Sequence, residues 1–489
     1  MMHMSEDMPP GDSSLPAVLS PIAPATPVAP PVDDDGPTLR PAVVLDDHDD
    51  QLKALLDNLV LTISHFFGGI PRIFAGVHDP RVAAKSDYSL AMLLTTGLLM
   101  FVCRLEARRQ IALQLRNSRG ARKMKTLFGV EAVPHGDTLN EAFEKLDPDQ
   151  MQEVTCSMVE SLIRNKVLDR YRFLGRLVVA VDGTGLWKFA ARHCEHCLTA
   201  THGTQTVYYH NTLEAKLVTS DGFVFSLMTE FIENTAPNQS KQDCELKAFY
   251  RLAERLKKRF PRLSLLFTLD GLYAVGPVFD LCARFNWKYL AVLKDDSLKS
   301  VNREFASLSQ LQPENRLTVR TNELTEELSW VNDIDYTDTE GRAHKLHVLQ
   351  CVDSKATSSG KRSTHRWVGN VKIGPERAMA VATEGGRIRW KIENEGFNEQ
   401  KNRGYGLEHA YSKNPIAAKI FYHLLQIAHT ITQLLEKGSL LKKAFSRGFG
   451  SGKNLALRLL EAWRNLSVWT DEALSRLLGE RIQIRLNSS

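Results

Sequence analysis

Three acidic residues have the residue type and the placement that a metal-dependent site for reactions at phosphorus needs. Asp182 ends an apolar run in VVAVDGTG, and Asp270 ends a second run in LLFTLDGLY. Each pattern predicts a strand that stops at Asp followed by Gly, so that the carboxylate faces a crevice where a ligand can bind. The third acid, Glu393, lies in the predicted helix RIRWKIENEGF. An Asp-Gly pair after a strand can also be a simple turn, in which Gly takes a positive φ.

Carboxylates in this arrangement favour divalent cations. Two carboxylates on adjacent strands and one on a helix can hold two metal ions about 4 Å apart, beside the attacking and the leaving oxygen of an in-line displacement. Mg²⁺ suits such a site because it is a hard cation that keeps water and phosphate ligands, and Mn²⁺ is the expected substitute. Asp243 and Glu245 open a later predicted helix, where they suit its dipole or lie near the metals.

The elements that would position these acids begin at about residue 176. RLVVAVD, TVYYHNTLEAKLV and GFVFSLMTEFI predict three antiparallel strands. A helix at 241–260, the strand LSLLFTLD, a helix at 275–285 and the strand KYLAVLK follow. The predicted fold class is therefore α/β with the order β-β-β-α-β-α-β-α. A β-rich stretch at about 298–365 precedes the last helix, which carries Glu393.

This order resembles the ribonuclease H-like fold of DDE transposases, with a mixed sheet and an acid on the first strand, after the fourth strand and on a late helix. RWKIENEGFNEQK is similar to the Arg-Trp-x-Ile-Glu stretch of bacterial insertion-sequence transposases with a Tyr–Arg–Glu–Lys signature. The resemblance covers about residues 176–430, including a β-rich insertion before the Glu helix. It implies that the three acids are catalytic metal ligands. It also implies that Arg389 binds phosphate near the metals and that Trp390 contacts DNA at the cleaved end.

The signature differs from this sequence at two positions. Its Tyr falls on Gly386, which has no ring. Its Lys, expected seven residues after Glu393, falls on Gln400, one residue before Lys401. On an ideal helix Gln400 shares the face of Glu393 and Lys401 lies about 80° away. A one-residue π-bulge at Gly396 would return Lys401 to that face as a DNA contact. Alternatively, Glu395 is the third acid and the register is shifted by two.

Four regions are predicted along the chain. Residues 1–45 form a disordered, acidic tail that holds ten of the twenty prolines. Residues 46–171 are helical, with the basic cluster RLEARRQIALQLRNSRGARKMK, which indicates either DNA binding or a solvated basic face. Residues 172–430 form the catalytic domain, and residues 431–489 a helical C-terminal region.

The charge distribution favours nucleic acid as a partner. The first 50 residues hold ten Asp/Glu and one Arg, so the remainder carries 61 Lys/Arg against 47 Asp/Glu, a net charge of +14. A basic body suits a phosphate backbone, although many basic proteins bind none. The chain starts without the pattern of a signal peptide. The apolar run Leu90–Cys103 is shorter than the ~20 residues of a membrane span, so we expect a buried helix and no membrane partner.

Cysteine and tryptophan residues supply further candidates. Seven cysteines, an odd number, favour reduced thiols and a cytoplasmic protein. His193, Cys194 and Cys197 could supply zinc ligands or be ordinary side chains of a loop. Trp330 and Trp367 could stack on a base extruded from DNA or pack within the sheet.

Three functions remain open from these observations. The first is a DDE transposase that cleaves DNA and transfers the strand, the second a nuclease of the same fold without strand transfer, and the third a DNA-binding protein with a decayed core. The resemblance favours the first. It implies a cut-and-paste reaction that excises the element at its terminal inverted repeats through a DNA hairpin and inserts it into target DNA. It also implies a homodimer that binds the paired ends, and a cytoplasmic, nucleoid-associated location in a bacterium.

Overall fold

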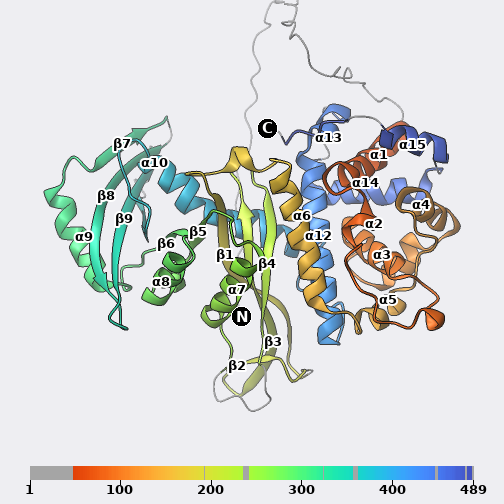
Figure 1. Cartoon of the computed structure of the whole chain (residues 1–489), viewed down its shortest axis with the longest axis horizontal. Helices are drawn as coiled ribbons and strands as arrows, with labels where there is room; N and C mark the ends of the chain where they lie inside the picture. Colours follow the sequence, from red (N-terminus) through yellow and green to blue (C-terminus); the bar gives the residue numbers. More distant parts are fainter. Residues whose placement is uncertain are drawn as a thin grey trace, which may run out of the picture. The chain divides into compact units, whose positions relative to one another are not determined.

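A mixed β-sheet lies at the centre of the computed structural model (Figure 1). The structure describes residues 48–486 except 192, 235–241, 323, 356–361, 446–449, 468 and 480–481, and except the side chains of 118 and 202. The predicted tail, residues 1–45, lies outside the described residues. The strands are β1 Leu177–Phe189, β2 Leu198–His202, β3 Gln205–Val218, β4 Val224–Ile232, β5 Leu265–Leu269, β6 Lys288–Val292, β7 Arg316–Arg320, β8 Leu324–Thr337, β9 Ala343–Lys355 and β10 Arg362–Gly369.

Helices flank this sheet along most of the described chain. The α-helices are α1 His48–Phe67, α2 Ile70–Ile73, α3 Leu90–Val102, α4 Ser118–Phe128, α5 Gly136–Phe143, α6 Pro148–Arg164, α7 Glu245–Arg259, α8 Gly276–Arg284, α9 Lys299–Leu311, α10 Ala378–Ala380, α11 Glu399–Asn402, α12 Pro415–Lys437, α13 Ser439–Ala444, α14 Gly452–Asn465 and α15 Asp471–Gly479. The 3₁₀ and π segments are η1 Ala83–Lys85, η2 Ile111–Leu115, η3 Asp169–Tyr171, η4 Gly271–Tyr273, η5 Val381–Gly386, η6 Arg387–Arg389 and η7 Ile392–Asn398.

The middle of the sheet has the order β4-β3-β1-β5-β6. The β4–β3 and β3–β1 pairs are antiparallel, whereas the β1–β5 and β5–β6 pairs are parallel. β5 is apolar at almost every position and fully buried, as expected of a strand that is covered on both faces. α6, α7 and α12 pack against β4. The fold is therefore α/β with a mixed sheet, and the three predicted antiparallel strands are confirmed.

The predicted β-rich stretch extends this same sheet. β10 pairs with β6, and β9, β8 and β7 follow in order toward the sheet edge. The stretch also contains α9, which the sequence pattern did not indicate. Only Val301 and Phe305 of α9 are buried, so its apolar face is too narrow to give a clear helical period.

The helices at the two ends of the described chain pack on one another. α12 packs against α3, α6 and α1, and α14 packs against α1 (Figure 1). The boundary expected at residues 430–431 therefore falls inside α12.

α3 is buried along most of its length, which confirms the prediction that the apolar run Leu90–Cys103 is a buried helix. Among the described residues, His48–Ile73 is long and apolar enough to cross a membrane, but 61% of its apolar window is buried, as in many core helices.

Candidate active site

Asp182 lies within β1 and not at its end, which corrects the prediction made from the Asp-Gly pair. β1 continues to Phe189 because its antiparallel pairing with β3 persists beyond the aspartate. Its parallel pairing with β5 ends at Ala180 and Thr268. Asp182 and Asp270 each lie two residues beyond that last pair. The two aspartates therefore lie at the same edge, where the parallel strands separate.

Asp270 directly follows β5, as predicted. Its Oδ1 accepts a hydrogen bond of 2.7 Å from the backbone N–H of Leu272 and so caps the short segment η4. The turn that an Asp-Gly pair commonly forms is thus present. A carboxylate has two oxygens, each with two lone pairs, so this cap leaves Asp270 able to bind a cation.

The third acid comes from the helical segment 378–402, which α10, η5, η6, η7 and α11 form with several π turns. Thr268 on β5 donates a 3.3 Å hydrogen bond to the carbonyl oxygen of Gly386 in this segment. A Cβ atom at Gly386, the position of the signature Tyr, would lie 2.4 Å from the ring of Trp367. The indole of Trp367 thus occupies the space that a larger residue at position 386 would need.

Arg389 and Glu393 on this segment both act on Asp182. Nη1 of Arg389 lies 3.2 Å from Oδ2 of Asp182, and this ion pair is mostly buried. Burial raises the pKa of Asp182 to about 6. Arg389 opposes this shift, and the negative charges of Glu393 and Asp270 add to it. The three predicted acids are therefore close enough for their charges to interact.

Glu395 has different neighbours. Its Oε1 accepts a hydrogen bond of 2.8 Å from Nζ of Lys391, and its Cγ lies 3.5 Å from the Cβ position of Gly222 in the turn between β3 and β4. Glu393, whose charge reaches Asp182, is exposed. This geometry favours the register in which Glu393 is the third acid.

The π-bulge predicted near Gly396 corresponds to the π segment η7. Gln400 is fully buried and donates to the side chains of Gln426 and His429, at 2.9 Å each. Lys401 forms its ion pair with Glu408, at 3.2 Å, and with none of the three acids in the described contacts. A role of Lys401 at DNA thus stays a prediction.

A fourth carboxylate, Glu245 at the start of α7, also lies at this site. A Cβ atom on Gly183 would be 2.2 Å from Oε1 of Glu245, so the glycine next to Asp182 makes room for this side chain. Burial, followed by the charges of Asp182 and Asp270, raises the pKa of Glu245. The hydroxyl of Tyr273 is buried without a hydrogen-bond partner in the described structure. Burial and then the charge of Glu245 raise the pKa of Tyr273.

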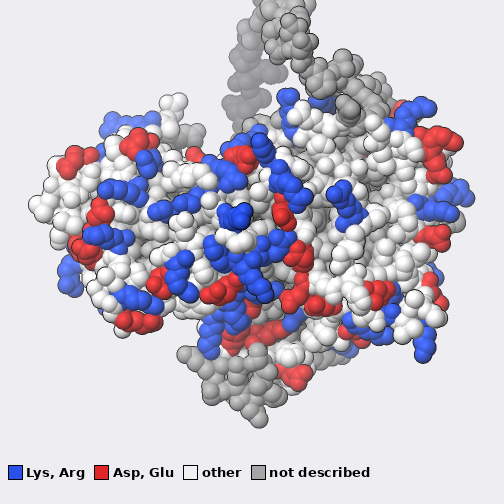
Figure 2. All heavy atoms as spheres, viewed as in Figure 1, with Lys and Arg blue, Asp and Glu red and all other residues white. Residues whose placement is uncertain are grey.

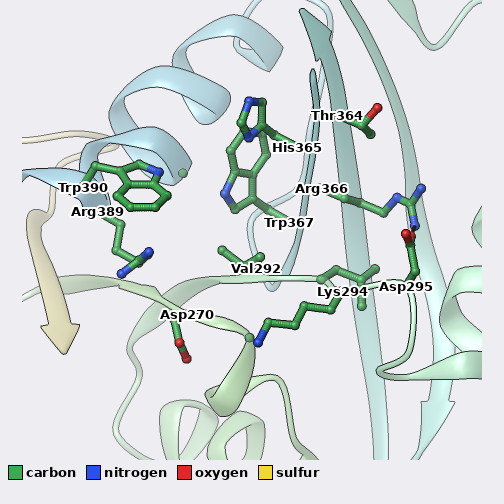
Figure 3. A pocket seen from close by; sticks show the side chains of 13 residues that line it. Asp270, Val292, Lys294, Asp295, Thr364, His365, Arg366, Trp367, Arg389 and Trp390 are labelled. Atoms are coloured by element: carbon green, nitrogen blue, oxygen red, sulfur yellow. Dashed lines mark hydrogen bonds and ion pairs between the residues drawn. The ribbon is translucent and has the colours of Figure 1, made fainter. Parts of the chain in front are cut away.

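A pocket of about 400 Å³ opens beside these acids. Figure 3 shows Arg389 and Lys294 extending toward its Asp270 end, one from the helical segment and one from the end of β6. The Cβ position of Gly271 lies 2.7 Å from Cε of Lys294, so the lysine stem lies over the glycine. Sequence reasoning missed Lys294, which lies two residues after the end of the apolar strand β6, much as Asp270 follows β5.

Two tryptophans line the same pocket. Trp390 is 54% exposed and lies under the guanidinium of Arg389, at 4.9 Å from the ring centre. Trp367 is mostly buried and stacks on His365 at 6.0 Å. Trp330 in β8, in contrast, is only 1% exposed. It offers no ring face to a base, which contradicts the predicted stacking role of Trp330.

A comparison with protein families bears on the helices before the sheet. Residues 72–159 match the model of a family described as DDE_Tnp_1-associated. Over these residues the chain is similar to a domain associated with DDE-type transposases. A comparison with curated proteins gave no match. The matched residues run from α2 to α6 and include none of the acids described above, so the match and the acidic site come from different parts of the chain.

The transposase-associated match gives the acidic site a chemical context. Asp182, Asp270, Glu393 and Glu245 bring up to four negative charges to one place, and Arg389 offsets one of them. The donors are all carboxylate oxygens, the ligand type that Mg²⁺ and Mn²⁺ prefer. A divalent cation would offset both the burial of the Asp182 carboxylate and its repulsion by Glu393 and Asp270, which together raise its pKa, so the residues present fit such a metal.

The candidate zinc residues lie elsewhere, at the far end of β1. Cys194 and Cys197 are in the loop between β1 and β2, and both sulfurs face His210 on β3. His193 instead stacks on Tyr208, with 4.1 Å between ring centres. Of the three predicted ligands, the structure therefore brings together the two cysteines, and His210 takes the place expected of His193.

Proposed function

We propose that this protein is a DDE transposase that cleaves DNA at the ends of an insertion sequence and transfers the freed strand to target DNA. The observation that supports the proposal most is the interaction of Glu393 and Asp270 with Asp182, together with the Arg389 ion pair. The family match at residues 72–159 adds independent support.

A ribonuclease H-like core is part of this proposal. The strand order β4-β3-β1-β5-β6, with antiparallel pairs on one side of β1 and parallel pairs on the other, supports it. So does the position of the acids, because Asp182 lies on the first strand and Asp270 directly follows the fourth strand of this core.

Asp182, Asp270 and Glu393 would hold Mg²⁺ or Mn²⁺, with Glu245 beside them. Bound metal would supply positive charge at the attacking and leaving oxygens of a phosphodiester. The chain's own residues orient the reactants. Arg389 holds the Asp182 carboxylate in place through their ion pair, and its guanidinium can also donate to phosphate.

The pocket next to the acids suits a nucleotide at the DNA end. Lys294 and Arg389 supply positive charge, and Trp390 supplies an exposed ring. Stacking on an aromatic ring contributes about 1–3 kcal/mol per base, which offsets a large part of the cost of extruding a base. Cleavage through a DNA hairpin, which requires an extruded end base, is therefore part of the proposal, with Trp390 as the exposed ring.

Double-stranded DNA is the proposed partner, bound by a homodimer on paired ends. Residues 51–489 carry a net charge of +14. Figure 2 shows Lys and Arg side chains gathered across the middle of the visible face, with Asp and Glu side chains among them. Such a mixed surface contacts phosphates at its basic positions, and the salt dependence of binding reports how many.

Two matched variants test the proposed site, Glu393→Gln and Glu395→Gln. The substrate is end-labelled DNA that carries the inverted repeats flanking the gene, incubated with Mg²⁺. Loss of a metal ligand should reduce cleavage by about 100-fold or more, since metals supply several kcal/mol to such reactions. Glu395→Gln, two residues away and paired with Lys391, should cleave like the wild type. Full cleavage by Glu393→Gln would overturn the assignment, and cleavage without joined products would identify a nuclease.

A further inference from the structure

Three potential metal ligands meet beyond the end of β1, outside the acidic site. The sulfurs of Cys194 and Cys197 lie 3.6 Å apart. Nε2 of His210 lies 3.3 Å from the first sulfur and 3.2 Å from the second. All three ligand atoms lie within 4.8 Å of one another. Two thiols and an imidazole nitrogen form one of the donor sets that zinc prefers in proteins.

These distances agree with a tetrahedral site. Zn–S and Zn–N bonds of about 2.3 Å and 2.0 Å place two sulfurs about 3.8 Å apart and a sulfur and a nitrogen about 3.5 Å apart. The three separations between Cys194, Cys197 and His210 differ from these values by about 0.3 Å or less. A zinc ion could thus enter without a rearrangement of the backbone.

The surroundings hold each ligand in place. The backbone N–H of Cys194 donates to the sulfur of Cys197 at 3.3 Å and so helps to fix the position of this sulfur. Nδ1 of His210 faces the carboxylate of Glu233 at 4.0 Å. A carboxylate behind a metal-binding histidine fixes the orientation of its ring. Glu233 is held in turn by Lys419 of α12, at 2.6 Å.

We propose that Cys194, Cys197 and His210 bind one zinc ion. His196 in the same loop is turned toward the carbonyl oxygen of Asn234, so the described residues supply three ligands and water completes the tetrahedron. The proposal concerns a different site from the acidic one and does not depend on the proposed function.

The ion would fasten the outer part of the strand that carries Asp182. His210 lies on β3 next to Tyr209, which pairs with Lys188 of β1 and Leu198 of β2. This end of β3 lies toward the bottom of Figure 1, beside β2. Zinc would tie the loop between β1 and β2 to β3, and through Glu233 to α12.

Metal content of the purified full-length chain tests this proposal. We expect about one zinc per chain in the wild type and a loss of zinc in Cys197→Ser and His210→Ala. Cys244→Ser is the matched control, because Cys244 is an exposed thiol outside the cluster. It should retain zinc. Glu233→Gln should weaken zinc binding about 10-fold to 100-fold, as other supporting carboxylates do.

A second measurement keeps the proposal testable if a cysteine variant fails to fold. A zinc-selective chelator should lower the Tm of the wild type, zinc should restore it, and cobalt should give the absorption of a thiolate-bound ion. Zinc content that is unchanged in a folded Cys197→Ser protein would overturn the proposal. A Cys194–Cys197 disulfide without metal, in protein purified anaerobically with zinc present, would also overturn it.

Discussion

Replacing Asp182 with Asn should stabilise the metal-free protein at neutral and alkaline pH. Burial raises the pKa of Asp182 to about 6, despite the Arg389 ion pair, and the charges of Glu393 and Asp270 contribute. Each pKa unit corresponds to about 1.4 kcal/mol, so ionising this carboxyl in the fold costs about 3 kcal/mol. Asn has no charge to ionise. Its one oxygen can accept either the 2.9 Å hydrogen bond from the N–H of Gly183 or the bond from Arg389, so the loss of the other bond offsets part of the gain.

The sign of the pH dependence follows from the direction of this shift. The pKa of Asp182 in the folded state is higher than the value of about 3.9 expected in the unfolded chain, so below about pH 3 the carboxyl is neutral in both states and the cost is absent. The cost grows as the pH rises from about 4 to 6, reaches about half at pH 5, and is complete above about pH 7. The gain from Asp182→Asn should therefore be about twice as large at pH 8 as at pH 5.

Thermal unfolding in the presence of a chelator measures this gain. An unfolding entropy of about 2.1 cal/mol/K per residue, applied to the compact unit 43–489, converts 1 kcal/mol into about 1 °C. We expect Tm to rise by about 2–3 °C at pH 8. Asp335→Asn, at a side chain that is 80% exposed, should leave Tm unchanged. Mg²⁺ should raise Tm in the wild type and less in Asp182→Asn. A lower Tm at pH 8, or an equal gain at both pH values, would refute the argument.

Three further predictions concern DNA contact and the core. Trp390→Ala should weaken DNA binding about 10-fold, measured by filter binding, without a change in Tm. Trp330→Ala, at a buried ring, should instead cost about 3–5 kcal/mol of stability, measured by thermal unfolding. Glu214→Ala should cost about 3–5 kcal/mol by removing the carboxylate partner of the buried Lys216, with Lys216→Met partly restoring Tm. DNA affinity should fall steeply with salt, and a flat dependence would exclude a phosphate-dominated interface.

The apolar strands and the acids next to them could be predicted from the sequence because local patterns determine them. β5 is a short apolar run, and Asp270 follows it directly. The predicted end of β1 at Asp182 was wrong because the pairing partner decides where that strand ends. β3 continues beside β1 as far as Phe189, and no residue near Asp182 indicates this long partner.

Residues that join the site through the topology of the chain could not be assigned from local patterns. Glu245 lies beside the acids because the first turn of α7 packs its side chain against Gly183, which precedes it by more than sixty residues. Before the fold is known, the same glutamate fits equally well as a helix-dipole residue. Trp330 and Trp367 differ for a similar reason. Both lie on strands of the extended sheet, but only Trp367 faces the pocket.

The electrostatic cost of the acidic site is itself an argument for a bound cation. Asp182 is mostly buried, carries a pKa of about 6 and faces the charges of Glu393 and Asp270. Replacing it with a neutral side chain would relieve about 3 kcal/mol, a large part of the 5–15 kcal/mol that stabilises a typical fold. A protein that only bound DNA through surface cations would gain nothing from this arrangement. A site that binds divalent metal recovers the cost on binding, because the cation pairs with the same carboxylates. The cost of burying this carboxylate beside two other acids therefore favours the proposed metal-dependent enzyme over a decayed DNA-binding protein.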